Sequence, residues 1–257
     1  MNEDIIARLD GVTLTYHEPA RETKAIERLS LSVRRGEFLS IVGPSGCGKT
    51  SVLKLLTGLY EPSSGSVSVL GARPREALKK VGYMLQRDEL LDWRTIEKNV
   101  LLGLEVKREL KPETRKKAVE LMEKYGLGEF RRHYPSELSG GMRQKAALIR
   151  TLAFSPELLL LDEPFSALDY QTRLILEDEV REVIKQGGYT AILVTHDISE
   201  AICMSDRVAV FTGRPACVRR EFEIDLDGSA LQRRRAAGFP ALFDEIWKEL
   251  KADEQGA

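Results

Sequence analysis

The sequence predicts an α/β fold in which a parallel β-sheet is flanked by helices and interrupted by an all-helical insertion. Three observations support this prediction. The apolar segment 38–42 runs through a glycine-rich turn directly into a helical pattern. Between about residues 88 and 154, apolar residues recur at three- and four-residue intervals, which is typical of amphipathic helices. From residue 158 onward, short apolar strands and helical segments alternate, which indicates parallel strands joined by crossover helices.

The elements before the insertion are mostly strands. Polar and apolar residues alternate in the first three, which predicts strands with one buried face. Segment 38–42 is apolar throughout and therefore predicts a strand that is covered on both faces. Strands are expected over residues 5–9, 12–16, 29–33, 38–42, 66–70 and 81–85, and a helix is expected over 49–59.

The insertion and the C-terminal half contain most of the expected helices. Pro112 stands where a helix can begin, and Ser139 suits the N-cap of another. Helices are expected over 95–106, 113–125, from about 139, and over 170–185, 198–204 and 239–250. Strands are expected over 158–161, 190–195 and 207–211, with an edge strand over 217–224 and a polar tail before the last helix.

The composition excludes several classes of protein. Of the 257 residues, 42% are hydrophobic and 31% are charged, which is ordinary for a soluble globular protein. The net charge of −1 predicts no nucleic-acid partner, and we interpret short basic clusters such as 233–235 as solvated helix faces. We expect neither a signal peptide nor a segment that approaches the ~20 apolar residues of a membrane span. The three cysteines share no metal-type spacing, so we interpret them as small packing residues in a reduced cytosol.

The strongest local motif is a phosphate loop, G-P-S-G-C-G-K-T, at residues 43–50. It follows a predicted strand and opens a predicted helix, which is the context that this motif requires. Its backbone N–H groups and the helix N-terminus attract phosphate oxygens, Lys49 reaches the β- and γ-phosphates, and the Thr50 hydroxyl is placed for Mg²⁺. The alternative is an ordinary glycine turn with a solvated lysine. The expected nucleotide contacts are Gly43, Pro44, Ser45, Gly46, Cys47, Gly48, Lys49, Thr50 and Ser51.

Two acidic residues follow the apolar strand at 158–161. Ligands of parallel sheets bind at the carboxyl ends of the strands, so Asp162 suits an Mg²⁺-holding role. Glu163 points elsewhere and could take a proton from an attacking water. Taken alone, the pair could be an acidic strand end before the turn at Pro164.

A second glycine-rich helix start, Ser139-Gly140-Gly141, lies far from the phosphate loop in sequence. Ser139 suits the N-cap, and the two glycines leave backbone N–H groups bare. Standing alone it could be a plain helix cap. Together with the phosphate loop it predicts that one γ-phosphate is gripped from two sides, by two subunits.

These motifs, in this order and spacing, resemble ATP-binding cassette (ABC) ATPases over nearly the whole chain. The resemblance rests on the phosphate loop, Gln86, residues 138–142, Asp162-Glu163, residues 166–169 and His196. It implies a P-loop NTPase core of ABC type with an antiparallel β subdomain and an α-helical subdomain inserted at about 88–154. We expect residues 1–230 to form a single ABC ATPase domain and residues 231–257 a short helical tail.

The resemblance also implies a role for each site residue. ATP and Mg²⁺ would be bound by a head-to-tail dimer, each ATP lying between the phosphate loop of one copy and Ser139-Gly140-Gly141 of the other. The implied roles are Tyr16 stacking on adenine, Gln86 touching Mg²⁺ and the attacking water, Asp162 and Thr50 holding Mg²⁺, Glu163 as general base, His196 contacting the γ-phosphate and Asp169 linking the two sites. For Tyr16 the alternative is a tyrosine that serves only its strand.

Within the family, residues 86–95, Met142 and the terminal stretch with Trp247 resemble importer subunits for nitrate, sulfonates and taurine. Asp92 and Lys145 depart from that group's pattern. The likeness implies integral-membrane permease subunits as partners, a solute-binding protein as an indirect one, and a peripheral location on the cytoplasmic face of the bacterial inner membrane. Residues expected to contact the permease are Leu90, Leu91 and Trp93; the alternative is that Trp93 is buried within its own helical subdomain.

Other functions of the same motifs remain as alternatives. A soluble ABC protein acting on DNA would carry a long coiled-coil arm and one acting on the ribosome would carry two cassettes, and this sequence has neither. A regulatory or assembly ABC ATPase that moves no solute is a further alternative that is compatible with the sequence. A kinase with a phosphate loop has no reason to carry the Leu-Ser-Gly-Gly segment. The transported solute is decided by the membrane and binding subunits.

Overall fold

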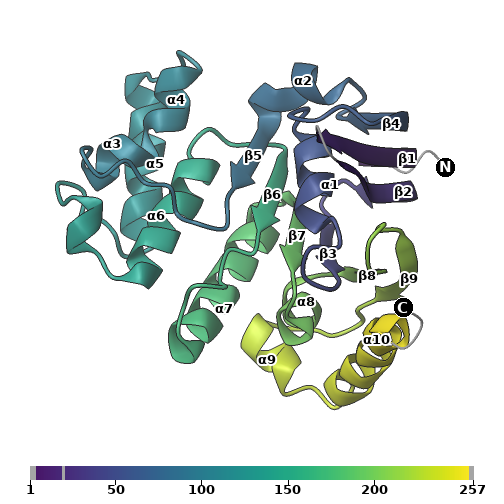
Figure 1. Cartoon of the computed structure of the whole chain (residues 1–257). Coiled ribbons are helices and arrows are strands. Elements are labelled where there is room, and N and C mark those ends of the chain that lie inside the picture. The colour runs from purple at the N-terminus through teal and green to yellow at the C-terminus, as the bar shows by residue number, and fades with distance from the viewer. Residues whose placement is uncertain (1–3, 19–20, 255–257) are drawn as a thin grey trace. The chain divides into compact units, whose positions relative to one another are not determined.

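The structure is a computed structural model that describes residues 4–18 and 21–254. The chain divides into two compact units along the sequence (Figure 1). Unit 1 comprises residues 1–78 and 177–257, and unit 2 comprises residues 79–176. Unit 2 is therefore an insertion between the two halves of unit 1.

Unit 1 contains an antiparallel sheet with the strand order β2-β1-β4. Its strands are β1 (Ile5–Glu18), β2 (Arg21–Arg34) and β4 (Ser64–Val69). The sequence predicted β1 as two shorter strands. The chain instead continues through Gly11, whose φ of 56° lies in the left-handed region and accommodates an irregularity in the pairing between Leu9 and Val12.

The second set of strands in unit 1 is mainly parallel. β3 (Phe38–Val42) lies between β7 (Thr190–Thr195) and β8 (Arg207–Phe211) and pairs in parallel with both. All residues of these three strands are buried, so both faces of the sheet are covered, as the apolar run of β3 predicted. β9 (Val218–Glu223) pairs antiparallel with β8, as the predicted edge strand.

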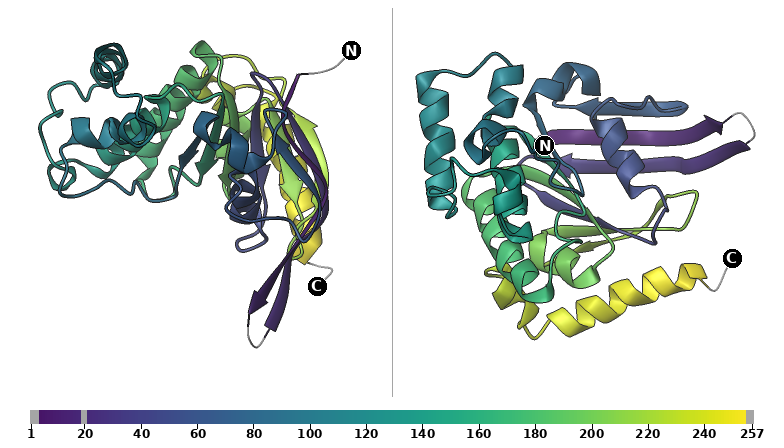
Figure 2. Two further views of the ribbon diagram at one scale, coloured as in Figure 1. Left: turned by 90° about the horizontal axis from the view of Figure 1, so that it is seen from above. Right: turned by 60° about the vertical axis from the view of Figure 1, so that its left-hand side comes forward.

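The helices of unit 1 pack on these strands. The helix that follows the phosphate loop is α1 (Lys49–Leu56), and α8 (Ile198–Met204) follows β7. The C-terminal helix α10 (Phe239–Glu254) lies beside α8 and the β8–β9 edge (Figure 2), where Ile246 is buried in a common core with Ile202 and Val210. The short helices of unit 1 are α2 (Pro74–Ala77) and α9 (Ala230–Arg234). The 3₁₀ turn Leu78–Lys80 and helix α7 (Tyr170–Gln186) each contain residues of both units.

The sequence predicts only a polar tail where α9 lies. A capping box marks the start of this helix: the Ser229 hydroxyl accepts from the Gln232 N–H at 3.4 Å, and the Gln232 side chain accepts from the Ser229 N–H at 2.8 Å. The interpretation of 233–235 as a solvated face is wrong for Arg233. This side chain is buried and donates to the Ser205 carbonyl oxygen at 2.6 Å, where it satisfies an acceptor at the C-terminal end of α8.

Unit 2 joins a parallel strand pair to a group of helices. β5 (Val81–Met84) pairs with β6 (Leu158–Asp162). The helices share one apolar core and are α3 (Ile96–Val100), α4 (Leu102–Val106), α5 (Pro112–Lys124) and α6 (Gly140–Leu152), with a 3₁₀ turn at Pro135–Glu137. The single helix expected over 95–106 is divided at Leu101, whose ψ of −8° departs from the helical value of about −42°. Among the described residues, no helix is both long and apolar enough to cross a membrane.

Candidate nucleotide site

The phosphate loop and His196 follow neighbouring parallel strands of unit 1. Val42, the last residue of β3, is paired with Thr195, the last residue of β7. The loop begins at the next residue of one strand and His196 at the next residue of the other, so both lie at the carboxyl edge of the sheet. Asp197 then caps α8 by accepting from the Ser199 N–H at 2.8 Å, which fixes the turn that presents the exposed His196.

Two glycines leave space that a side chain would fill in the phosphate loop. A Cβ atom on Gly43 would lie 3.1 Å from both Cys47 Sγ and Phe211 Cβ. Gly48 has a φ of 129°, and a Cβ atom there would lie 2.9 Å from the Ala25 carbonyl oxygen. Gly48 is also the N-cap of α1 and provides no side-chain cap, so the partial positive charge of the N-terminus of α1 faces the loop, where it favours an anion.

Lys49 supplies a positive charge that no carboxylate of residues 4–18 or 21–254 pairs with. The residue is only 5% exposed, and its ammonium donates to the carbonyl oxygens of Gly43 at 2.7 Å and Pro44 at 3.0 Å. In the described part of the chain, no ion pair includes this ammonium. A glycine-lined loop, an uncapped helix N-terminus and an unneutralised lysine together fit the phosphate groups of a nucleotide.

Tyr16 on β1 is fixed by two contacts within unit 1. Its hydroxyl lies 2.8 Å from the Ser51 hydroxyl at the start of α1. Its ring meets the ring of Tyr60 edge-on, with centroids 5.4 Å apart and planes inclined by 75°. Tyr16 is half-buried, and the bond to Ser51 places this aromatic ring beside the helix that carries Lys49 and Thr50.

Gln86 and Glu163 come together at the carboxyl ends of β5 and β6. The Gln86 side-chain amide donates to the Glu163 carboxylate at 3.3 Å and lies 3.4 Å from the Ser166 hydroxyl. Ser166 in turn donates to the Glu163 carbonyl oxygen at 3.0 Å. Glu163 has a φ of 45°, an unusual conformation for a residue with a side chain that costs about 1–3 kcal/mol and concentrates at functional sites.

Tyr83 is a site residue that the sequence analysis missed. Its hydroxyl donates to the Asp162 carboxylate at 3.1 Å. Burial, and then the negative charge of Asp162, raise the pKa of Tyr83 well above its usual range, so its hydroxyl stays protonated and donates. The strand register brings the two side chains together: Tyr83 pairs with Leu160, and Asp162 follows two residues later on the same face of the sheet. No sequence motif marks Tyr83.

A divalent cation at Asp162 would take most of its ligands from the nucleotide. Asp162 is buried at the end of β6. In the part of the chain that the structure describes, no group of three or more His, Cys, Asp or Glu side chains could hold a metal ion. One carboxylate with phosphate oxygens is the environment that Mg²⁺ favours, so this donor set fits a magnesium–nucleotide complex and does not fit a dedicated protein cage.

The second glycine-rich helix start is built as the sequence predicted. Ser139 is the N-cap of α6, and its hydroxyl accepts from the Met142 N–H at 3.3 Å. The two glycines differ in their surroundings. A Cβ atom on Gly141 would lie 2.6 Å from Thr172 Cγ2, whereas on Gly140 it would meet only Leu168 at 3.7 Å. Gly141 is therefore required by packing inside the chain, and Gly140 has no such internal constraint.

Asp169 is engaged at the start of α7. Its carboxylate accepts from the Thr172 N–H at 3.0 Å. Hydrogen bonds from the Thr172 side chain and then from its backbone N–H lower the pKa of Asp169, which is exposed and stays ionised.

Helix α6 also fixes the segment that follows Gln86. Arg143 donates to the Asp88 carboxylate at 3.0 Å. Arg150 donates to the carbonyl oxygens of Asp88 at 2.6 Å and Glu89 at 2.7 Å, and Glu89 has a left-handed φ of 45°. The segment carrying Gln86 is thereby tied to the helix that begins at the second glycine pair.

Leu90 and Trp93, which were both expected to contact a permease, differ in exposure. Leu90 was expected to face a partner, but it is buried in the core of the helices of unit 2, because its apolar side chain is removed from water in the same cluster as Ile96 and Val100. Trp93 is 76% exposed, which contradicts the alternative that it is buried in its own subdomain.

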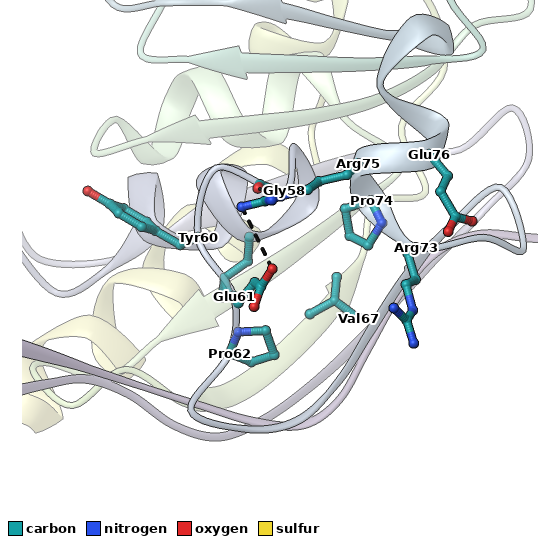
Figure 3. Close-up of a pocket in the computed structure, with 10 residues that line it drawn as sticks. Gly58, Tyr60, Glu61, Pro62, Val67, Arg73, Pro74, Arg75 and Glu76 are labelled. Atoms are coloured by element: carbon teal, nitrogen blue, oxygen red, sulfur yellow. Dashed lines mark hydrogen bonds and ion pairs between the residues drawn. The ribbon is translucent and has the colours of Figure 1, made fainter.

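A surface pocket of about 470 Å³ lies elsewhere in unit 1, between the end of α1, β4 and α2 (Figure 3). Arg75 spans it, donating to the Gly58 carbonyl oxygen at 3.0 Å and pairing with Glu61 at 3.7 Å. Its charged lining residues, Glu61, Arg73, Arg75 and Glu76, balance one another, and no phosphate-loop residue lines it. The pocket therefore offers no net charge to attract a phosphate.

Known proteins resemble the chain over nearly its whole length. The family described as ABC transporter matches residues 26–166. An uncharacterized ABC transporter ATP-binding protein, YtlC of Bacillus subtilis, is 46% identical over 96% of each chain. The aliphatic sulfonates import ATP-binding protein SsuB of Bacillus licheniformis is 37% identical over 91% of this chain and 89% of its own.

A solved structure agrees with these relatives. It is an ATP-binding cassette in a dimeric post-hydrolysis state bound to ADP and phosphate. It has a TM-score of 0.75 and 30% identity, and the match covers 85% of this chain and 99% of that one. This chain therefore belongs to the ABC transporter family and is an ATP-binding cassette with ATPase activity.

Proposed function

We propose that the chain is the nucleotide-binding subunit that energises an ABC importer for a small solute of the nitrate, sulfonate or taurine type. The import protein SsuB, which matches along 91% of this chain, supports the importer assignment. In this proposal residues 1–230 form the ABC ATPase domain, with the helical subdomain inserted at about 88–154, and residues 231–257 form a C-terminal tail.

In the proposed mechanism the residues of unit 1 bind the nucleotide. Tyr16 stacks on adenine, while Lys49 and the N–H groups at the start of α1 hold the phosphates. Thr50 and Asp162 are the residues that would hold Mg²⁺, which when bound neutralises charge on the phosphate oxygens. His196, at the edge where the phosphate loop begins, contacts the γ-phosphate.

Glu163 acts as the general base, and the observation that carries this assignment is its contact with Gln86. The amide donates directly to the carboxylate at 3.3 Å, so a water bound beside the pair would meet an amide that orients it and a base that takes its proton. The left-handed φ of Glu163 supports the assignment, because strain of this kind concentrates at functional sites.

The complete site needs a second copy of the chain. Ser139-Gly140-Gly141 of the partner copy would close on the γ-phosphate, in a head-to-tail dimer that makes the same contact twice. The solved relative is a dimer bound to ADP and phosphate, which supports this arrangement. Asp169 would connect the two sites. Hydrolysis removes the bridging phosphate and releases the clamp.

Trp93 supports docking on permease subunits at the cytoplasmic face of the bacterial inner membrane. Its large apolar side chain is 76% exposed, and it lies four residues after Glu89, whose carbonyl oxygen accepts from Arg150 of α6. A permease seated on Trp93 would therefore sense the state of the nucleotide site. A solute-binding protein would act indirectly, through the permease.

Replacing Glu163 with Gln tests the assignment of the base. The amide keeps the size of the carboxylate, and its oxygen can still accept from Gln86, but it is too weak a base to take the proton. We expect ATP binding to persist and turnover to fall by at least about 10²-fold, measured as phosphate release beside equilibrium ATP binding. Glu120→Gln is the matched control, because Glu120 is exposed on α5 and forms an ion pair with Lys116 at 3.8 Å. Turnover near the normal rate in Glu163→Gln would show that another group is the base.

A further inference from the structure

The turn between β8 and β9 is fastened to the phosphate loop. Within the turn, Thr212 accepts from the Cys217 N–H at 3.0 Å. Ala216 joins the turn to β2, since its N–H donates to the Ala25 carbonyl oxygen at 2.9 Å and its carbonyl oxygen accepts from the Glu27 N–H at 3.0 Å. Ala216 also faces Gly48, where an added Cβ atom would lie 3.4 Å from its own. The turn is therefore a fixed wall beside the loop.

Arg214 extends from this wall to the tip of the phosphate loop. Its Nη2 and Nε atoms both donate to the Gly46 carbonyl oxygen, at 2.6 and 3.1 Å. Among the described residues no carboxylate forms an ion pair with Arg214, so its charge is directed to a neutral carbonyl group. The two hydrogen bonds to one carbonyl oxygen fix the guanidinium group of Arg214 on the phosphate loop.

The contact with Arg214 stabilises the conformation of the loop tip and offsets the partial negative charge of the Gly46 carbonyl group. Gly46 has a φ of 73°, and the next peptide closes a tight turn through a bond from the Cys47 N–H to the Pro44 carbonyl oxygen at 3.2 Å. Such a turn, with a glycine in it, depends on outside contacts to hold one conformation. The guanidinium also covers the partial negative charge of the Gly46 carbonyl, which would otherwise repel a phosphate group.

The positive charge of Arg214 reaches the interior of the loop. Burial raises the pKa of the Cys47 thiol, and the charges of Lys49 and Arg214 both oppose this rise. A second cation beside the loop therefore adds to the field of Lys49 where an anion binds.

We propose that Arg214 is a positioning residue of the phosphate loop, which holds the Gly46 peptide in the conformation that binds the phosphates of ATP and contributes positive charge there. The inference rests on the proposed role of residues 43–50. It gives the β8–β9 turn a role in nucleotide binding, although this turn belongs neither to the phosphate-loop motif nor to the acidic pair Asp162-Glu163.

Substitution of Arg214 tests this inference in the purified full chain. We expect Arg214→Ala to raise the KM for ATP about tenfold, the scale of a lost charge-assisted hydrogen bond, and to leave kcat within about twofold. Arg214→Lys keeps the charge but cannot place two donors on one oxygen, so its KM should lie between the two. Raising salt should increase the KM of the wild-type chain more than that of Arg214→Ala.

Arg220→Ala is the matched control. Arg220 lies on β9 and pairs with Glu245 and Glu249, and its loss removes the same charge from the same edge without touching the loop. Its KM and kcat should equal those of the wild-type chain. An unchanged KM in Arg214→Ala, or equal KM shifts in Arg214→Ala and Arg220→Ala, would overturn the inference.

Lys49→Ala separates this inference from the proposed function. If Lys49→Ala keeps full ATP affinity, the loop is not the phosphate site and the proposed function fails with it. If Lys49→Ala loses ATP while Arg214→Ala binds it normally, only the role of Arg214 fails. Should Arg214→Ala not fold, as judged by its melting temperature, Arg214→Lys decides the question, because it retains the aliphatic stem.

Discussion

At the residue scale, hydrogen bonds orient the acidic pair at the end of β6. Gln86 donates to Glu163 and Tyr83 donates to Asp162, so a hydrogen bond fixes the orientation of each carboxylate. Because burial and the charge of Asp162 raise the pKa of Tyr83 well above its usual range, this donor is present throughout neutral pH. Partners of this kind orient a metal ligand and set its affinity.

Removing the Tyr83 hydroxyl should therefore weaken Mg²⁺ binding and spare nucleotide contacts. In Tyr83→Phe we expect the Mg²⁺ concentration for half-maximal ATPase activity to rise about tenfold, with little change in kcat at saturating Mg²⁺. The measurement is a Mg²⁺ titration of phosphate release at fixed ATP. An unchanged titration would mean that Asp162 does not hold the metal or needs no orientation by Tyr83.

The sequence shows the residues of the loop motifs but not the partners that hold them. Tyr83 is 79 positions from Asp162, and Arg214 is 168 positions from Gly46. Neither residue belongs to a motif, and only the strand register and the β8–β9 turn bring them to their partners. The left-handed conformation of Glu163 is equally invisible in sequence, since glutamate does not favour it.

At the element scale, helix α6 links the second glycine pair to Gln86. The link is made by Arg143 and Arg150, of which Arg150 holds two carbonyl oxygens of the segment after Gln86. The sequence predicted this helix and its N-cap correctly, because both depend on local patterns. It placed β1 and the 95–106 helix less well, because a bulge at Gly11 and a break at Leu101 depend on packing.

Loosening this link should slow hydrolysis without weakening ATP binding. In Arg150→Ala the carbonyl oxygens of Asp88 and Glu89 lose their donors, and we expect kcat to fall several-fold and amide exchange of residues 86–89 to quicken. Arg115→Ala is the control, because Arg115 pairs with Glu97 and does not contact that segment. Hydrogen exchange with mass spectrometry, beside ATPase assays, measures both. Normal exchange and normal kcat would show that α6 does not control Gln86.

At the scale of the whole molecule, the proposed mechanism requires two copies of the chain to share each ATP. In the proposed dimer one copy provides the phosphate loop, where Lys49, which forms no ion pair among the described residues, and the N-terminus of α1 would attract the phosphates. The other provides the start of α6, where Gly140 has room inside its own chain for a side chain. A glycine that its own fold does not require is consistent with a surface that must admit a ligand or partner closely.

Mixing two complementary variants tests the shared site most directly. In a Glu163→Gln background, one chain carries Lys49→Ala and the other Gly140→Asp, whose carboxylate repels a phosphate without the clash that Gly141 would suffer. Light scattering with ATP and Mg²⁺ should show monomers for each variant alone and dimers for the mixture, because only the mixed pair retains one intact site. Monomers in the mixture, or dimers from either variant alone, would contradict the account.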